Sequence, residues 1–197
     1  EDFSSLYEEY FNVNLPFRDA LVTANAMLDY FVFKDSSSDE VIVGKDGWLF
    51  YASTIQDYQK TNLYTIEELD VIVHNMETMK SYFEEKGIEF YVYIAPNKAS
   101  IYGNEYLPEK IVSREGISRT EQLIEHISEN SKVLAMFGKE ALQVAYEKYP
   151  NEDLYHHLDT HWNYLGGYYA AKDLLKQMKV ELPERSQLNV VENNEPT

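Results

Sequence analysis

Between residues 88 and 148, short runs of β-branched and aromatic residues alternate with longer amphipathic stretches, and this alternation limits the folds open to the chain. Residues 88–94 and 132–136 are apolar on both faces, as strands of a buried parallel sheet are. Residues 118–130 and 137–148 carry apolar positions at helical spacing. Strands that alternate with helices of this length predict βαβ units, with helices on both faces of the sheet. The sequence therefore predicts an α/β fold.

Further helices and a hairpin are predicted around this unit. Thr65 lies three residues before Glu68, a capping-box spacing that predicts the start of a helix ending near residue 85. Ser118 stands in the same relation to Glu121 and predicts a second capped start. The remaining expected elements are a helix at 164–178 and a hairpin whose strands, 41–43 and 48–51, flank a tight turn at 44–47.

The first 38 residues are predicted to form a unit of their own. Apolar residues recur on one helical face near residues 6–11 and again over 18–33, before the polar run 34–38. We therefore expect an N-terminal helical segment and linker at 1–38 and one α/β domain at 39–197. The chain opens with neither an initiator methionine nor a basic leader, so we expect a signal or membrane anchor to have been removed.

The end of the chain lacks a feature that the fold needs. Residues 183–197 are polar and rich in turn formers, without the apolar run of a further strand. We therefore expect an α/β domain that lacks its C-terminal part. An incomplete sheet leaves a strand edge unpaired, and such an edge favours a homodimer.

Composition excludes several classes of partner and site. The chain has 34 acidic and 17 basic residues and a net charge of -17, which repels the phosphate backbone of nucleic acids. It has no cysteine, so disulfides, thiol chemistry and cysteine-based zinc sites are excluded. The 17 tyrosines suit either core packing or contact with carbohydrate, and packing is the simpler role.

The densest polar cluster, residues 155–163, holds three of the five histidines and lies just before a predicted helix. Asp159 and His161 are two residues apart, so on an extended loop their side chains point the same way. A carboxylate in that position can orient an imidazole and stabilise its protonated form. Asp159 and His161 are therefore candidates for the orienting residue and the base of a catalytic site.

This cluster also allows a structural role and a metal-binding role. Asp159 or Thr160 can cap the following helix while His161 packs, as a purely structural segment would. Alternatively, histidines 156, 157 and 161 bind a metal together with Asp159, although no His-Glu-x-x-His spacing supports such a site.

A second polar cluster follows the strand predicted at 88–94. Ligand clefts of open α/β sheets lie at the carboxyl ends of strands, so Asn97, Lys98 and Tyr102 are candidates for substrate binding. A structural turn formed by Pro96 and Asn97 accounts for the same residues equally well. The segment 44–50 instead predicts a structural hairpin with a buried tryptophan.

Four segments stand in a recognisable order and separation: PFR at 16–18, GKDGWLFY at 44–51, APNKASIY at 95–102 and DTHWN at 159–163. Together they resemble the AlgJ/AlgX-like, or DHHW-type, family of exopolysaccharide O-acetyltransferases. The resemblance implies an SGNH-hydrolase-like fold, a three-layer α/β/α sandwich. It also implies an extracellular or cell-surface location, with a membrane anchor preceding the domain.

The same resemblance implies acyl transfer by a Ser-His-Asp triad without a cofactor or a metal. Asp159 then orients His161, which activates a serine, and Trp162 and Asn163 join the substrate-binding candidates. The serine is expected later in a Gly-Asp-Ser-like turn, but only Ser186 follows, without such a turn, so we do not assign it. The nucleophile is therefore expected beyond Thr197.

The implied partners are a polysaccharide acceptor and a membrane-bound acyltransferase that supplies the acetyl group. Two alternatives to an acetyltransferase or acetylesterase-like domain remain open. One is a non-catalytic module that binds glycan or takes part in assembly, and the other is a metal-dependent hydrolase.

Overall fold

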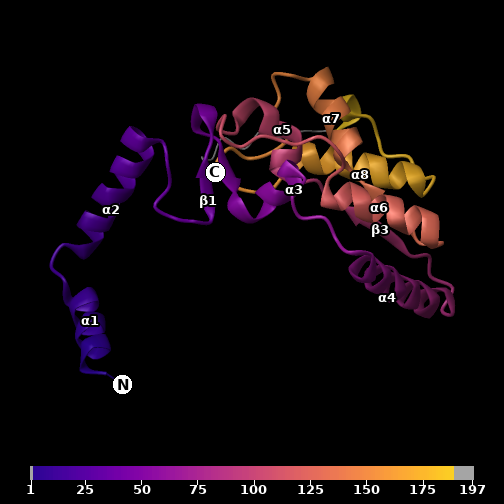
Figure 1. Cartoon of the computed structure of the whole chain (residues 1–197). Helices are drawn as coiled ribbons and strands as arrows, with labels where there is room; N and C mark the ends of the chain where they lie inside the picture. The colour runs from indigo at the N-terminus through magenta and orange to yellow at the C-terminus, as the bar shows by residue number, and fades with distance from the viewer. Residues whose placement is uncertain (1, 189–197) are drawn as a thin grey trace.

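A computed structural model describes residues 2–188 of the chain (Figure 1). Its elements in chain order are α1 (Phe3–Asn14), α2 (Arg18–Leu28), the π-helix η1 (Asp29–Phe33), β1 (Val41–Val43), η2 (Lys45–Gly47), β2 (Leu49–Tyr51), η3 (Ala52–Thr54), α3 (Ile55–Gln59), α4 (Ile66–Glu84), β3 (Tyr91–Ile94), α5 (Lys98–Tyr106), α6 (Arg119–Asn130), β4 (Leu134–Phe137), α7 (Lys139–Lys148), α8 (Tyr164–Gln177) and η4 (Arg185–Gln187). Nine of the predicted tail residues, 189–197, lie outside the described part.

The centre of the fold is a parallel pair of strands, β3 and β4, with Tyr91 opposite Leu134 and Ile94 opposite Phe137. Alternate side chains of a strand point to opposite faces. Val92 accordingly packs in a cluster with α4 and α6, whereas Tyr93 packs against the cluster that contains residues of α5, α7 and α8. This arrangement is a three-layer α/β/α sandwich, and the predicted α/β class is confirmed.

The strands are less buried than the sequence predicts. Every residue of β3 is half-buried, and Leu134 at the start of β4 is exposed. In the described part of the chain the sheet contains only β3 and β4, so each of them has one unpaired edge. The prediction that these strands are buried was therefore wrong in degree, because an edge without a neighbouring strand leaves part of each strand open.

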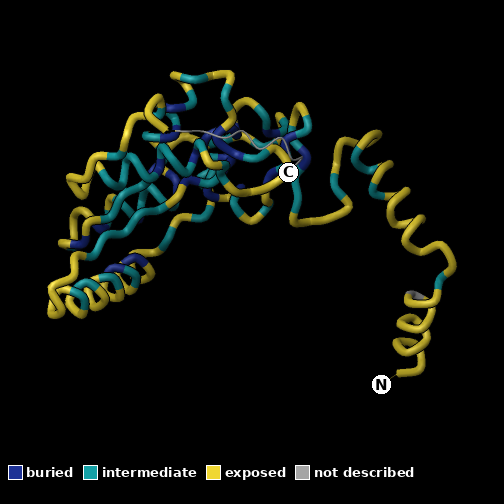
Figure 2. The backbone as a smooth tube through the Cα atoms, turned by 180° about the vertical axis from the view of Figure 1, so that it is seen from behind, coloured by how far each residue is buried: buried dark blue, intermediate teal, exposed yellow. Residues whose placement is uncertain are grey.

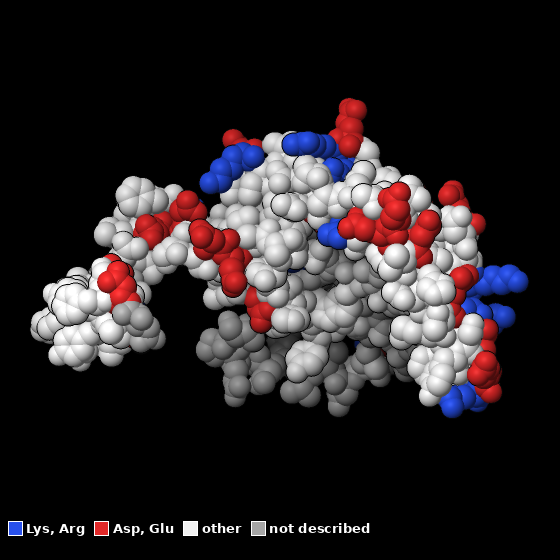
Figure 3. Space-filling model, turned by 60° about the horizontal axis from the view of Figure 1, so that its bottom comes forward, with Lys and Arg blue, Asp and Glu red and all other residues white. Residues whose placement is uncertain are grey.

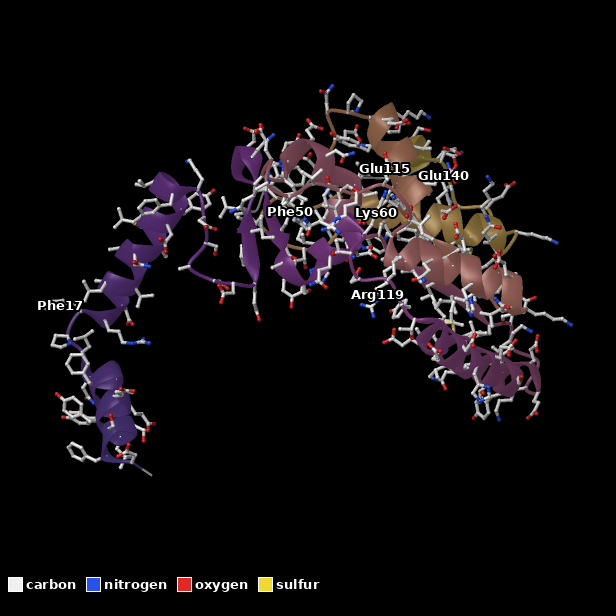
Figure 4. All side chains as sticks on the ribbon, in the orientation of Figure 1. Phe17, Phe50, Lys60, Glu115, Arg119 and Glu140 are labelled. Atoms are coloured by element: carbon white, nitrogen blue, oxygen red, sulfur yellow. The ribbon has the colours of Figure 1, made fainter. Side chains whose placement is uncertain are left out.

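The predicted hairpin is confirmed and packs against the main domain. β1 and β2 pair antiparallel, with Val41 opposite Tyr51. Trp48 and Phe50 are each 2% exposed, and Phe50 lies where the hairpin meets the rest of the domain (Figure 4). A Cβ on Gly44 would lie 2.5 Å from the carbonyl oxygen of Tyr106, so the hairpin approaches α5 as closely as backbones allow.

Both predicted capping boxes are present. The Thr65 hydroxyl accepts a bond from the Glu68 amide while the Glu68 carboxylate accepts one from the Thr65 amide. The same exchange joins Ser118 and Glu121 at the start of α6. These bonds satisfy amides that the first helical turn leaves without partners, which explains why both helices begin where predicted.

Helix α5 was not predicted, because its start gives a weak signal. Asn97 occupies the N-cap position, but its side chain makes no capping hydrogen bond. Gly103 lies inside the helix, where glycine is unfavourable by propensity. Here a Cβ would lie 2.5 Å from the Tyr58 ring, so packing requires glycine. The sequence of this segment is therefore typical of a turn, although the segment is helical in the structure.

The N-terminal helices project away from the sandwich (Figure 1). They are exposed along almost their whole length (Figure 2). The predicted helix over 18–33 is confirmed, although it changes to π-helical geometry at Asp29. The boundary at residue 38 remains a prediction.

Within residues 2–188 no helix is both long enough and apolar enough to cross a membrane.

Candidate functional site

Asp159 and His161 form a hydrogen-bonded pair on the loop between α7 and α8. The Asp159 Oδ1 atom lies 2.6 Å from the His161 Nδ1 atom and also accepts the His161 amide at 3.0 Å. These two bonds lower the pKa of Asp159 to about 2. Asp159 is therefore ionised at neutral pH and can only accept a hydrogen bond, which fixes the proton of a neutral His161 on Nδ1.

The pair is open to solvent, with 80% of the His161 side chain and 57% of the Asp159 side chain exposed. With Nδ1 bonded to Asp159, the Nε2 atom of a neutral His161 has a free lone pair. This atom can accept a proton from a hydroxyl group brought against the loop. The geometry therefore provides a base and its orienting carboxylate.

The two sides of the loop that carries the pair are hydrogen-bonded to each other. Tyr155 and Trp162 form an antiparallel bridge, and the His156 amide donates to the His161 carbonyl at 3.2 Å. The Tyr155 hydroxyl donates to the carbonyl of Pro96, which lies just before α5. The pair thus sits at the tip of a small, tied loop.

Asn163 is the N-cap of α8. Its side-chain oxygen accepts the amides of Leu165 at 2.9 Å and Gly166 at 3.1 Å, and its amide group donates to the Asp153 carbonyl. The alternative in which Asp159 or Thr160 caps this helix is therefore wrong. Asn163 was also predicted to bind substrate. Its oxygen is used in capping and its amide nitrogen bonds the Asp153 carbonyl, while the residue is only half-buried, so the role in substrate binding stays a prediction.

The Lys98 side chain was predicted to bind substrate, but only 4% of the residue is exposed. Its ammonium lies 2.7 Å from the Leu49 carbonyl, and it also bonds the carbonyls of residues 156, 157 and 159. Burial lowers the pKa of Lys98 to about 8, while the carboxylates of Asp159 and Asp153 act in the opposite direction. Lys98 therefore contacts backbone rather than a ligand, and we revise its role.

Tyr102 is also inside the domain, with no exposed surface. Its hydroxyl oxygen accepts the Leu154 amide at 2.8 Å, and its ring stacks on Trp48 at 4.5 Å. Burial raises the pKa of Tyr102 to about 12. A substrate cannot reach this hydroxyl in the folded domain, so its role is to support the loop.

The two other predicted substrate residues keep partial access to solvent. Asn97 is half-buried at the start of α5, and Trp162 is half-buried against the main core. They stay predictions as substrate contacts.

A second Asp–His pair lies on the same loop and was missed as a pair. His157 Nε2 is 2.8 Å from Asp153 Oδ2, and the His157 ring stacks on Trp48 at 4.2 Å. The sequence signal was the adjacent His156 and His157, which were considered only as metal ligands. His157 pairs with Asp153 and His161 pairs with Asp159, so the loop carries two Asp–His pairs that share no residue.

The metal alternative finds no support in the part of the chain that the structure describes. There, no three His, Asp or Glu side chains gather where they could hold a metal ion. A cavity of about 630 Å³ lies elsewhere, between α7 and α8, and Tyr149, Lys172 and Arg185 are among the residues that line it. None of the predicted site residues lines that cavity.

Two adjacent glycines on α8 offer a test of how the helix meets the loop. A Cβ on Gly166 would lie 2.3 Å from the Leu154 carbonyl oxygen, whereas one on Gly167 would lie no closer than 3.6 Å to Trp162. We expect Gly166→Ala to lower the free energy of unfolding by about 2 kcal/mol, because backbone must move. Gly167→Ala should instead be neutral or raise it by about 0.5 kcal/mol through helix propensity. Urea denaturation measures both, and equal effects would contradict the close approach at Gly166.

Comparison with known proteins adds an independent line of evidence. The family described as "SGNH hydrolase-like domain, acetyltransferase AlgX" matches residues 41–195. The probable alginate O-acetylase AlgJ of Pseudomonas aeruginosa is 22% identical over 189 residues, which are 95% of this chain and 44% of that protein.

Two solved structures are also similar. The O-acetyltransferase domain of Pseudomonas putida AlgJ has a TM-score of 0.47 and 18% identity, covering 77% of this chain and 50% of that one. Bacillus cereus PatB1 with a sulfonyl adduct has a TM-score of 0.48 and 17% identity, covering 80% and 48%. The chain thus spans half or less of the length of each of these relatives. The family match extends over most of the chain, from the hairpin to the segment beyond α8, and on this evidence the chain belongs to the AlgX-type SGNH-hydrolase-like acetyltransferase family.

Proposed function

We propose that this chain supplies the base and its orienting carboxylate to an O-acetyltransferase that acts on a polysaccharide. The observation that carries the proposal is the 2.6 Å bond between Asp159 and His161, two residues of the segment that matches the family. The serine nucleophile is proposed to come from beyond Thr197.

In the proposed reaction His161 moves protons while Asp159 holds it in place. His161 Nε2 takes the proton of the serine hydroxyl as its oxygen attacks the acetyl carbonyl, and then gives that proton to the leaving group. In the second half, the same nitrogen takes the proton of a sugar hydroxyl as the sugar oxygen attacks the acetyl carbonyl of the acetyl-serine. The bond from that carbonyl to the serine oxygen then breaks, and His161 returns the proton to the serine oxygen. The Asp159 carboxylate stabilises the positive imidazolium formed in both halves.

The acceptor and location are further parts of the proposal. The Pseudomonas aeruginosa relative is a probable alginate O-acetylase, which supports an exopolysaccharide or cell-wall glycan as acceptor. A membrane-bound acyltransferase is the proposed acetyl donor. The domain itself is proposed to lie on the outer side of the cell membrane, held there by an N-terminal anchor. Acidic side chains are spread over several elements of the face drawn in Figure 3, and the net charge of -17 argues against nucleic acid as a partner. The unpaired strand edges make a homodimer the proposed assembly.

Intact-mass analysis tests the proposal. This chain and a longer native form are incubated with an activated acetyl ester, each beside its His161→Ala variant. We expect one acetyl adduct on the longer form only, lost in the variant, because only that form joins the base to a serine.

The outcomes separate the alternatives. An adduct that survives in His161→Ala would show that His161 is not the base. If neither form is acetylated, calorimetry on the same samples measures glycan binding. Binding without acetylation would support the non-catalytic module.

A further inference from the structure

Lys98 connects the hairpin to the loop that carries the Asp159–His161 pair. Its ammonium lies 2.6 Å from the His156 carbonyl, 2.7 Å from the His157 carbonyl and 3.0 Å from the Asp159 carbonyl. A fourth acceptor at 2.7 Å is the carbonyl of Leu49 in β2. Three of the four acceptors therefore lie two to five residues before His161.

The surroundings of this ammonium are built for a buried cation. It lies 4.8 Å from the centre of the Trp48 ring and 5.3 Å from that of the Phe50 ring. An aromatic face and converging carbonyl oxygens replace the water that a buried ammonium loses. Lysine is suited to this position, because its three N–H donors point outward from a single atom, and two of the four carbonyls must share one donor.

The Lys98 bonds are among the ties that hold the loop against the rest of the domain. Its other ties include the Tyr155–Trp162 bridge, which is internal, and the bond from the Leu49 amide to the His157 carbonyl at 2.8 Å. The Asp159–His161 bond is also internal, since it spans two residues. The two internal bonds fix the shape of the loop. Its direction relative to the domain is set by the bonds that leave it, which are those of Lys98, the bond from the Leu49 amide to the His157 carbonyl and the bond from the Tyr155 hydroxyl to the Pro96 carbonyl.

We propose that Lys98 is a positioning residue: by holding the carbonyls of His156, His157 and Asp159 against Leu49, it sets the orientation of the Asp159–His161 pair on the domain. The catalytic meaning of this role rests on the proposed function. The orientation itself is measurable without any activity.

Residual dipolar couplings of the amide N–H bonds test the proposal on this chain. In the wild-type protein we expect the couplings of residues 156–161 to fit the same alignment as those of α6 and α7. In Lys98→Met we expect the loop couplings to depart from that alignment while the helices still fit. Leu142→Ala is the matched control, because it also removes a fully buried side chain, on α7, and leaves the Lys98 bonds intact.

Loop couplings that still fit in folded Lys98→Met would overturn the proposal and leave Lys98 a core residue only. If Lys98→Met does not fold, the test uses the wild-type protein. Scalar couplings between Lys98 Nζ and the carbonyl carbons of residues 156, 157 and 159 then show whether these hydrogen bonds are present. Their absence would overturn the proposal. Because neither measurement uses substrate, failure of the proposed function leaves both results valid.

Discussion

Lys98→Met is expected to lower the free energy of unfolding by about 3 to 5 kcal/mol, because several carbonyl groups lose their hydrogen-bond donor at once. Methionine has a similar length but no donor, so the carbonyls of Leu49, His156 and Asp159, whose bonds to Lys98 are partly buried, lose that partner. Each buried acceptor left unsatisfied costs about 1 to 3 kcal/mol, reduced where the backbone can relax toward water. Urea denaturation followed by circular dichroism measures the loss.

Lys45→Met is the matched control for this prediction. Lys45 lies in the hairpin turn, with 47% of its side chain exposed and only a 3.8 Å contact to Glu109. Its replacement should change stability by no more than about 0.5 kcal/mol. If both lysine variants changed the free energy of unfolding equally, the carbonyls around Lys98 would be able to replace the lost bonds with bonds to water.

Asp159→Asn is expected to reduce acetyl transfer by about 1,000- to 10,000-fold in a longer form that carries the nucleophile, as the loss of the orienting carboxylate does in comparable triads. The amide neither stabilises the imidazolium nor fixes its proton on Nδ1. Because the change acts on the transition state, turnover should fall while KM stays nearly constant. Steady-state kinetics with an activated acetyl ester and a soluble glycan acceptor measures both quantities.

Asp70→Asn provides a control with the same chemistry in a different place. The Asp70 carboxylate also pairs with a histidine, at 2.9 Å from His126 Nε2, but the pair joins α4 and α6. Its replacement should leave turnover within about threefold, since surface pairs contribute little to stability. A small effect of Asp159→Asn, similar to that of Asp70→Asn, would remove the Asp159–His161 pair from the mechanism.

Sequence reasoning found the elements whose signals are local. The capping boxes at Thr65 and Ser118 and the spacing of Asp159 and His161 each depend on residues a few positions apart, and the structure contains all three. The division into strands and helices was also visible, because apolar periodicity records which face is buried.

Sequence reasoning failed where tertiary contacts, rather than residue type, determine whether a side chain is buried. Lys98 and Tyr102 looked like ligand contacts, since polar groups after a strand are usually accessible at a sheet edge. Both are buried by the hairpin and by the loop before α8, through contacts that span 49 or more residues of sequence. Helix α5 was missed for the same reason, because Tyr58 and the hairpin, not a capping side chain, hold it in place.

The contacts of Lys98 also have a consequence for the order of folding. Its acceptors lie 49 residues before it and 58 to 61 residues after it in sequence. Closing loops of this length loses chain entropy before any bond forms, so contacts this distant assemble more slowly than helical turns do. The capped helices α4 and α6 can therefore form while the chain is still largely unfolded. The Asp159–His161 pair reaches its final orientation only after the hairpin, α5 and the loop before α8 have packed together.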